Sequence, residues 1–538
     1  MIRMPKAETA RMLDIHGWSA VLFGLALYVV VLTGAVVVFA HEIGAWSVSG
    51  HKMDGALAGK IDQSMATLTE QVPEEYRHDV SLYQNSAGYL IAFFHTHEKN
   101  DSGMLADIGT RFVLDPEDFS IVSRHDGFAD DMPDITSSFL EDFFVDLHVR
   151  LHAPNPIGLY LTGLLGLLLL VSAISGFIMH RNLIRDLFLS PRGANRLIKK
   201  RDKHTLAGTW SILFSIIVAF TGAFFSFATT LGLPVIAITA FEGDQQAAIE
   251  AVLGIQDAED PTPSPFVGVE AIVSRVQQTD AAGSLPTFIS IEHPGRVDAR
   301  VTTFHEPANG QLFGGSHLFN GATGEYLGKK PALGQQPSFG SDLISLVGVF
   351  HFGLFAGMLS KIIWLSLGLA TCYVTYTGLK LWVARREQQA RWRLMGRLTD
   401  ITAYGTVIAM NGAAIGFLAT YHRQPDVVID WTINGFFAAA LVSILVGFIR
   451  PAGAATSQIL QALMGLSLLV LPIARLITAD GDWSVYRLED NAVVIGMDIS
   501  LLVLGALFVW LALKATSLKP ITSMQAATET TKGATTHG

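Results

Sequence analysis

Six histidines stand at repeated positions near the ends of long apolar segments: His16, His148, His152, His180, His204 and His351. The segment from His16 to Ala35 matches the segment from His204 to Ala223, because each starts with a histidine and ends in Thr-Gly-Ala. In each copy a second apolar segment follows, preceded by His148 or His351. A duplicated two-helix unit with histidines at both edges predicts paired axial ligands for haem on each side of a bilayer, and hence transmembrane electron transfer.

The six histidines divide into two sets, which we expect at opposite faces of the membrane. One set comprises His148, His152 and His351, and the other comprises His16, His180 and His204. His148 and His152 are four residues apart, which predicts that they share a helix face. A helical path from His152 to His180 spans about 42 Å, so the two sets cannot share one iron. We therefore predict two low-spin bis-histidine haems, one per face; for any single histidine the alternative is an interfacial side chain bound to water or lipid phosphate.

Small residues recur beside these histidines in both copies: Thr33, Gly34, Ala35, Gly176, Thr221, Gly222 and Gly378. Small side chains allow close approach, either of one helix to another or of a helix to a porphyrin plane. The pattern alone leaves both interpretations open.

The composition indicates a membrane protein. Half of the residues are hydrophobic, 16% are charged and the mean hydropathy is +0.39. Such a chain must place much of its length in lipid, which argues against a soluble enzyme. Eight apolar stretches of about 20 residues predict eight spans, near 19–40, 157–179, 206–228, 362–383, 401–420, 432–449, 455–475 and 493–513.

The distribution of charge predicts the orientation. The segment 181–203 carries eight Lys or Arg residues against two Asp, which is typical of a cytoplasmic loop. With the termini also cytoplasmic, residues 42–147 and 230–342 project to the other side, which in a bacterium is the periplasm. The first of these segments has 20 acidic and 6 Lys or Arg residues, an excess of 14 negative charges. That excess fits either a soluble acidic segment without a specific partner or one that recruits a cationic or metal-bearing ligand.

The two exported segments each predict a small α+β module. The stretches IDQSMATLTEQV and VEAIVSRVQQ are typical of helices, and strand-like segments with turn signals follow each of them. His95 and His97 alternate with apolar residues in one such strand, where a solvated face is the simplest interpretation, although His-x-His can bind a metal weakly. The fold class is therefore a mainly α-helical polytopic membrane protein with about eight transmembrane helices and two small exported α+β modules.

The single cysteine limits the redox chemistry that the chain can support. Cys372 lies inside the fourth predicted span, so the exported segments contain no disulfide, no Cys-x-x-Cys-His haem attachment and no iron–sulfur ligation. The sequence also contains no G-x-G-x-x-G or P-loop motif. A redox group must then be bound by histidine or without covalent links, and electrons must come from an outside donor.

Several short segments around the repeated histidines resemble the motifs of a known family. DIHGWSAVLFG, LTGAVVVFAHEI, LHVRLH, GFIMHRNLIRDLFLSPRG, DKHTLAG and FHFGLFAG are similar to motifs of PepSY-associated transmembrane proteins, a group that includes iron-regulated inner-membrane proteins and siderophore-iron reductases. The resemblance covers roughly residues 11–390 and marks the exported modules as PepSY-like. It implies a b-type haem protein of the bacterial inner membrane that passes electrons to ferric siderophores.

The predicted domains follow from the spans and this resemblance. They are a first transmembrane helix (1–41), a periplasmic PepSY-like module (42–147), transmembrane helices 2–3 with the basic cytoplasmic loop (148–229), a second periplasmic PepSY-like module (230–342), transmembrane helix 4 (343–390), four additional transmembrane helices (391–515) and a polar C-terminal tail (516–538).

The expected function is that of a membrane-bound oxidoreductase of the ferric-siderophore reductase type with two b-type haems. Its expected partners are a ferric siderophore, membrane lipid and an electron donor that is a quinol or a cytoplasmic reductant, and no nucleic acid is involved. Reduction of Fe(III) weakens binding by hard oxygen chelators and so releases Fe(II). Two alternatives are a haem-free membrane protein whose PepSY-like modules bind or inhibit a periplasmic protein partner such as a protease, and a transporter that moves a chelate.

The predicted topology can be tested with reporter fusions. A reporter that is active only in the periplasm should be active when fused after residue 120 or 300 and silent when fused after residue 195, because the basic loop resists translocation. The reverse pattern would invert the proposed direction of electron flow.

Overall fold

The computed structural model describes most of the chain. The described residues are 5–48, 61–100, 105–116, 118–180, 187–188, 196–253, 260–279, 285–307, 314–334, 336–449, 454–478 and 488–517. The basic residues Arg181, Arg185 and Arg192 lie outside these ranges, as does nearly all of the predicted C-terminal tail.

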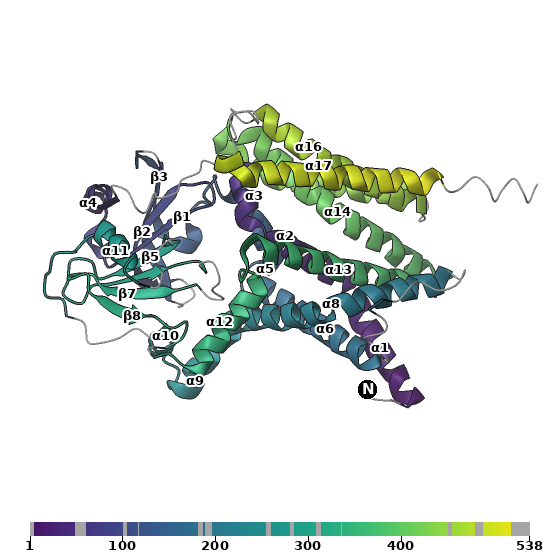
Figure 1. Cartoon of the computed structure of the whole chain (residues 1–538), viewed down its shortest axis with the longest axis horizontal. Coiled ribbons are helices and arrows are strands. Elements are labelled where there is room, and N and C mark those ends of the chain that lie inside the picture. The colour runs from purple at the N-terminus through teal and green to yellow at the C-terminus, as the bar shows by residue number, and fades with distance from the viewer. Residues whose placement is uncertain are drawn as a thin grey trace, which may run out of the picture.

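Long apolar helices make up one end of the molecule and a β-sheet the other (Figure 1). Seven described helices are long and apolar enough to cross a membrane, or eight if a bent pair at the N-terminus forms one span. They are α6 (Ile157–Met179), α8 (Arg196–Phe227), α13 (Gly357–Ala384), α14 (Ala390–Thr420), α15 (Val428–Ile449), α16 (Ala454–Thr478) and α17 (Leu488–Ser517). The prediction of a polytopic helical membrane protein is confirmed.

The first predicted span is not one straight helix. It consists of α1 (Lys6–Leu22) and α2 (Gly24–Val37), whose axes differ by 73°. The break lies at Phe23, whose φ of −121° and ψ of 8° interrupt the helical backbone. Gly24 then packs against Leu379 of α13, so the bend is held by a contact between helices. A short helix, α3 (Ala40–Ser47), continues the chain toward the sheet.

The two segments that the sequence predicts to be exported, 42–147 and 230–342, together form one sheet. The first contributes β1 (Asp79–Gln84), β2 (Leu90–Lys99), β3 (Leu105–Leu114) and β4 (Ile121–Phe128); the second contributes β5 (Phe288–Glu292), β6 (Arg300–Phe304), β7 (Ser316–Asn320) and β8 (Tyr326–Lys329). The strand order is β4-β3-β2-β1-β5-β6-β7-β8, with every pair antiparallel. The two predicted α+β modules are joined edge to edge, because β1 of the first half pairs with β5 of the second half.

Two helices cover one face of this sheet and complete its core. They are α4 (Ile61–Gln71) and α11 (Val269–Val276), and Ile61 and Ile272 pack with strand residues such as Leu82 in one buried cluster. Asp62 of α4 accepts a hydrogen bond from the backbone N–H of Val269 at 2.7 Å. A side chain of one half therefore satisfies the free N–H groups at the start of the helix of the other half.

Each half of the sheet is connected to the membrane helices by a further helix. β4 leads to α5 (Phe139–Arg150) and then to α6, and β8 leads to α12 (Phe339–Phe352) and then to α13. Between α8 and the second half lie α9 (Leu233–Ala240) and α10 (Gln245–Leu253). Short helical turns occupy Glu74–Tyr76, Ala129–Asp131, Ala228–Gly232 and Pro425–Val427.

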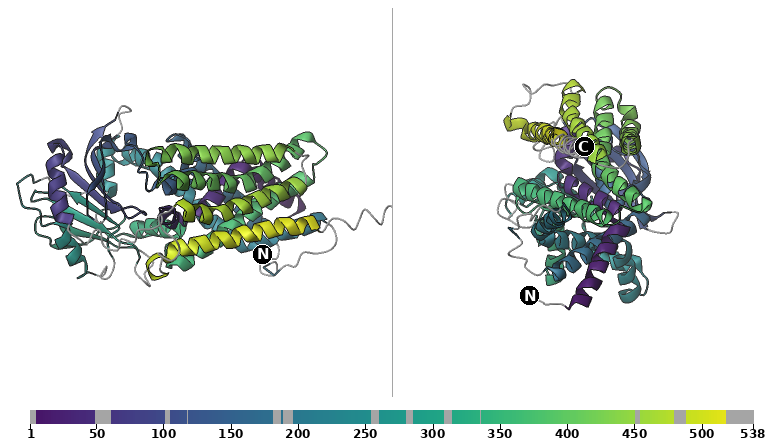
Figure 2. Two further views of the ribbon diagram at one scale, coloured as in Figure 1. Left: turned by 90° about the horizontal axis from the view of Figure 1, so that it is seen from above. Right: turned by 90° about the vertical axis from the view of Figure 1, so that its right-hand side faces the viewer.

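The last four helices pack as a layer on the others (Figure 2). Lys380 of α13 forms an ion pair with Asp400 of α14 at 2.8 Å, and Tyr376 donates a hydrogen bond to the same carboxylate. At the end nearer the sheet, the fully buried Arg475 of α16 pairs with Asp498 of α17. Trp46 of α3 donates its indole N–H to Asp498 at 2.8 Å. The four helices are thus attached by buried polar contacts at both ends.

The Arg475–Asp498 pair gives a test of this attachment. Asp498→Ala should lower stability by about 3–5 kcal/mol, because it leaves a buried guanidinium uncompensated. We expect a lower melting temperature in detergent, measured by the intrinsic fluorescence of the tryptophans. Asp426→Ala, at an exposed position before α15, is the matched control and should melt like the wild type. Equal melting of all three proteins would contradict a structural role for the pair.

Candidate functional site

Four of the six predicted histidines meet as two facing pairs. His16 of α1 lies opposite His204 of α8, with ring centres 6.2 Å apart. His148 of α5 lies opposite His351 of α12, with ring centres 6.3 Å apart. We call the first the sheet-distal pair and the second the sheet-proximal pair. Each pair takes one histidine from each copy of the duplicated unit.

The two pairs lie at opposite ends of the helix bundle. Helix α8 carries His204 of the sheet-distal pair, and its Thr221 is hydrogen-bonded to His351 of the sheet-proximal pair. These two α8 positions are 17 residues apart, a rise of about 26 Å. The hydrocarbon layer of a bilayer is about 30 Å thick. The pairs are therefore separated by nearly the thickness of a membrane.

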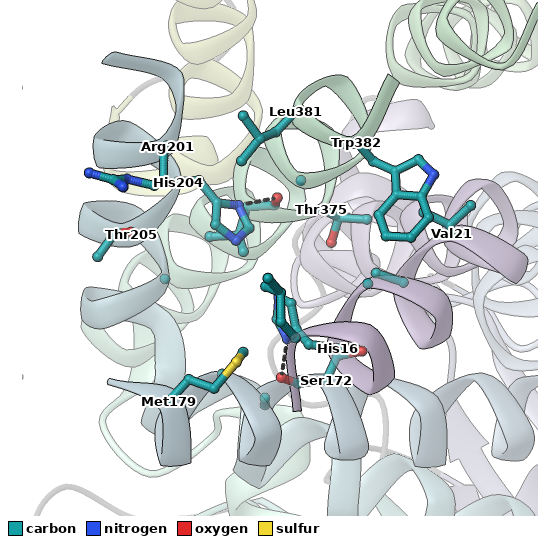
Figure 3. A pocket seen from close by; sticks show the side chains of 18 of the residues that line it. His16, Val21, Ser172, Met179, Arg201, His204, Thr205, Thr375, Leu381 and Trp382 are labelled. Carbon is teal, nitrogen blue, oxygen red and sulfur yellow. Dashed lines mark hydrogen bonds between the residues drawn. The ribbon is translucent and has the colours of Figure 1, made fainter. Parts of the chain in front are cut away.

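In the sheet-distal pair, backbone carbonyls fix the protonation of both rings (Figure 3). Nδ1 of His16 is 2.9 Å from the carbonyl oxygen of Ser172, and Nδ1 of His204 is 3.1 Å from that of Val374. A carbonyl oxygen can only accept a hydrogen bond, so each Nδ1 carries the proton. Each Nε2 then keeps its lone pair, which is the form in which imidazole binds a metal.

The sheet-proximal pair is held in the same way. Nδ1 of His148 donates to the carbonyl oxygen of Val30 at 3.0 Å. Nδ1 of His351 is 2.9 Å from the hydroxyl of Thr221, whose own hydrogen is donated to the carbonyl oxygen of Ile217 at 2.7 Å. The hydroxyl therefore accepts from Nδ1, and Nε2 of His351 is left with its lone pair.

A glycine lies against each of the four imidazoles. A Cβ atom placed on the glycine would lie 2.6 Å from Cε1 of the ring for Gly34 and His148, and 3.2 Å for Gly222 and His351. At the sheet-distal pair the distances are 3.4 Å for Gly176 and His16, and 3.2 Å for Gly378 and His204. These glycines, which the sequence linked either to helix packing or to a porphyrin, provide the space in which the rings stand.

Each pair lines a cavity. The sheet-distal cavity has a volume of about 710 Å³, and three arginines are among its lining residues: Arg201, Arg385 and Arg386. The sheet-proximal cavity has a volume of about 430 Å³, and its lining is largely apolar, including Phe225 and Trp364. Both volumes are in the range of about 300–1,000 Å³ that is usual for ligand sites. Leu27 and Leu169 line both cavities, so the two sites lie back to back.

The donor set of each pair fits a metal that brings its own equatorial ligands. Two metal–imidazole bonds of about 2 Å, added to the distance from each ring nitrogen to its ring centre, would separate two ring centres by about 6.2 Å. The observed 6.2 and 6.3 Å agree with this value. Among the described residues, the groups of three or more ligand atoms include none of these four histidines. Two opposed neutral imidazoles in an apolar cavity fit a haem, whose iron these two residues would hold.

The structure places the other two predicted ligands outside the pairs. Helix α5 ends at Arg150, and His152 follows it with a φ of 53°, so His148 and His152 do not share a helix face as predicted. The ring of His152 packs on Phe143 instead, with centres 4.2 Å apart. His180 follows the end of α6 and lines the sheet-distal cavity, but its Nε2 is hydrogen-bonded to Thr209 at 2.9 Å.

Comparison with known proteins identifies the class of protein to which this fold and these sites belong. The model of the PepSY-associated TM region matches residues 13–385, which include all four paired histidines. The chain therefore belongs to the PepSY-associated transmembrane family. An uncharacterised protein of Pseudomonas aeruginosa is 24% identical over 400 residues, which cover 70% of this chain and 95% of that relative. Helices α14 to α17 lie beyond the residues that the family model matches.

The glycine contacts can be tested by adding one methyl group. Gly34→Ala should displace the ring of His148 and reduce haem retained by the purified protein, read from its absorption spectrum. Gly24→Ala is the matched control: it lies on the same helix, and its Cβ would lie 2.8 Å from Cδ2 of Leu379, away from both cavities. We expect the control to cost stability but to keep the spectrum. Equal haem loss in the two variants would assign Gly34 to helix packing alone.

Proposed function

We propose that this protein is a haem-containing membrane oxidoreductase that carries electrons from a donor at the sheet-distal side to a ferric siderophore at the sheet side. The observation that supports this most strongly is the presence of two facing pairs of neutral imidazoles, one at each end of the helix bundle. We further propose the bacterial inner membrane as its location, with cytoplasmic termini and a periplasmic sheet.

The residues that would hold the two b-type haems are His16 with His204, and His148 with His351. A bound haem would supply an Fe(III)/Fe(II) couple that accepts and donates one electron at a time. In the sheet-distal cavity, Arg201, Arg385 and Arg386 provide positive charge suited to carboxylate groups of a cofactor. Arg386 is fixed by stacking on Trp382, with its guanidinium carbon 3.7 Å from the ring centre.

The protein's own part in electron transfer is to fix the ligands and exclude water. Leu27 and Leu169 line both cavities and keep the region between the two pairs apolar. Rigid imidazoles in an apolar environment limit rearrangement when the charge changes, and burial and hydrogen bonding tune the potential of a bound group. No side chain needs to act as an acid, a base or a nucleophile in this proposal.

The substrate proposal rests on the chemistry of iron and on the charge of the sheet domain. Fe(III) in a siderophore is held by hard oxygen ligands, and its reduction to Fe(II) weakens that binding, so the chelator is not consumed. The excess of 14 acidic residues in segment 42–147 favours a cationic or metal-bearing ligand on that side. The electron donor is proposed to be a quinol or a cytoplasmic reductant.

Single histidine variants test the assignment of the two sites. His204→Ala and His351→Ala should each lower the haem content by about half, because each removes one of two axial bonds from a different site. In reconstituted vesicles, His204→Ala should also block ferric-siderophore reduction by the membrane donor, followed with a ferrous-iron chelator. Dithionite should still reduce the haem that this variant retains.

The matched control is His152→Ala, since His152 lies near the sheet-proximal pair but outside its cavity. It should keep full haem content and full reduction. Unimpaired reduction by His204→Ala would show that electrons enter elsewhere. Full haem content in both pair variants would refute the ligand assignment itself.

A further inference from the structure

Histidine and aspartate side chains gather at one end of the sheet, on the face opposite α4 and α11. Asp79 opens β1 and lies opposite His95 of β2. Two residues further along β2, His97 lies opposite Asp107 of β3. Side chains alternate between the two faces of a strand, and Val80, next to Asp79, packs in the core beneath the two helices. Asp79, His95, His97 and Asp107 therefore share the other face.

This end of the sheet is remote from both histidine pairs. The opposite end of β1 leads to Asn85, whose amide donates to Ser137 just before α5. Gln84 lies five positions after Asp79, a distance of about 17 Å along the strand. A site at Asp79 is thus separate from the haem sites proposed above.

Two buried atoms of this cluster have no hydrogen-bond partner among the described residues. They are Oδ1 of Asp79 and Nδ1 of His95. Asp79 is only 7% exposed and His95 only 8%. Buried polar atoms are almost always satisfied, so this pair of orphan atoms calls for a ligand. The ligand atoms of Asp79, His95 and His97 all lie within 4.8 Å of one another.

The third side chain, His97, is oriented by a second carboxylate. Its Nδ1 is 2.7 Å from Oδ1 of Asp107, and its Nε2 is 3.4 Å from Oδ2 of Asp79. A carboxylate bonded to one ring nitrogen, with the other nitrogen directed at the site, is the usual support of a metal-binding histidine. On β3, Gly109 lies opposite His95, so no side chain from that strand covers the imidazole.

One histidine from each half of the sheet, His78 and His293, lies near the same aspartate. His78 lies 3.0 Å from Oδ2 of Asp79 through its Nδ1, and the ring of His293, which follows β5, packs against His78 with centres 4.4 Å apart. Nδ1 of His293 is 3.1 Å from Asp298, which also pairs with Arg296 at 2.6 Å. These contacts place Asp79 at the seam between the two halves.

We propose that Asp79, His95 and His97 form a binding site for a divalent first-row transition-metal ion such as Zn²⁺ or Fe²⁺. Two imidazoles and one carboxylate suit these ions and do not suit Mg²⁺ or Ca²⁺, which prefer oxygen ligands. With metal–ligand bonds of about 2.0–2.2 Å, adjacent donor atoms lie about 3.0–3.4 Å apart, and the Asp79–His97 distance of 3.4 Å agrees. Three protein ligands leave positions for water or an exchangeable ligand. This site does not rest on the proposed electron transfer.

Calorimetric titration of the full-length protein in detergent with Zn²⁺ alone tests the site. The wild type should bind one equivalent at this site, and Asp79→Asn should weaken that binding at least tenfold. Asp107→Asn should weaken it about 10–100-fold, because it removes only the support of His97. His125→Gln, on β4 of the same sheet and outside the cluster, is the matched control and should bind like the wild type. Hydrogen bonds to Asp107 and Asp79 raise the pKa of His97 to about 10, so protons compete with Zn²⁺ for this imidazole. All proteins are therefore compared at the same pH.

A second readout is the melting temperature, which Zn²⁺ should raise in the wild type and in His125→Gln but not in Asp79→Asn. Haem absorption in the same samples should be unchanged, which separates failure of this site from failure of the proposed function. Wild-type affinity in Asp79→Asn, or equal binding of Mg²⁺, would overturn the proposal. If Asp79→Asn does not fold, Asp107→Asn tests the site instead, because the Asp107 side chain is 45% exposed and its replacement should not prevent folding. Unchanged Zn²⁺ binding in Asp107→Asn would also overturn the proposal.

Discussion

The hydrogen bond that each paired histidine donates from Nδ1 is the interaction on which the rest of the site depends. Its acceptor always belongs to another helix: Ser172 for His16, Val374 for His204, Val30 for His148 and Thr221 for His351. One bond therefore fixes both the tautomer of a ring and the position of the helix beside it. Helix α8 shows the coupling most clearly, because it carries His204 at one end and both Thr221 and Gly222 at the other. A shift of α8 along its axis would disturb both pairs at once.

The two copies of the duplicated unit pack together into a single structural unit. Each pair takes one histidine from each copy, and the two halves of the sheet share a seam at β1 and β5. The helices that carry the sheet-proximal pair, α5 and α12, follow directly after strands β4 and β8. The sheet therefore helps to set the position of His148 and His351, although it lies outside the membrane helices. The hydrogen bond from the backbone N–H of Val269 to Asp62 also joins the two halves of the sheet domain.

The sequence predicted the paired positions well because duplication repeats them at matched places, as with His16 and His204. The sequence did not predict the position of His152 correctly, because that position depends on where the backbone of α5 ends. The end of α5 at Arg150 removes His152 from the helix face that its spacing implied. The strand β1 is only six residues long, and it pairs with β5, which lies far away in the sequence, so neither β1 nor the shared sheet was expected. Most acceptors of the Nδ1 protons are backbone carbonyls, which no residue pattern reveals.

The attachment of the last four helices also could not be predicted from the sequence. It depends on single buried contacts such as that of Trp46 with Asp498, whose partners are far apart in sequence.

The most direct test of the central claim, that two pairs of histidines each ligate a haem, is electron paramagnetic resonance of the purified oxidised protein at low temperature. Bis-histidine ligation predicts low-spin ferric signals. The two imidazole planes differ by 73° in the sheet-distal pair and by 25° in the sheet-proximal pair. We therefore predict two distinct signals, the sheet-distal one with the larger low-field g value, and loss of only that signal in His204→Ala. A colourless protein without a ferric signal, or a high-spin signal alone, would contradict the account.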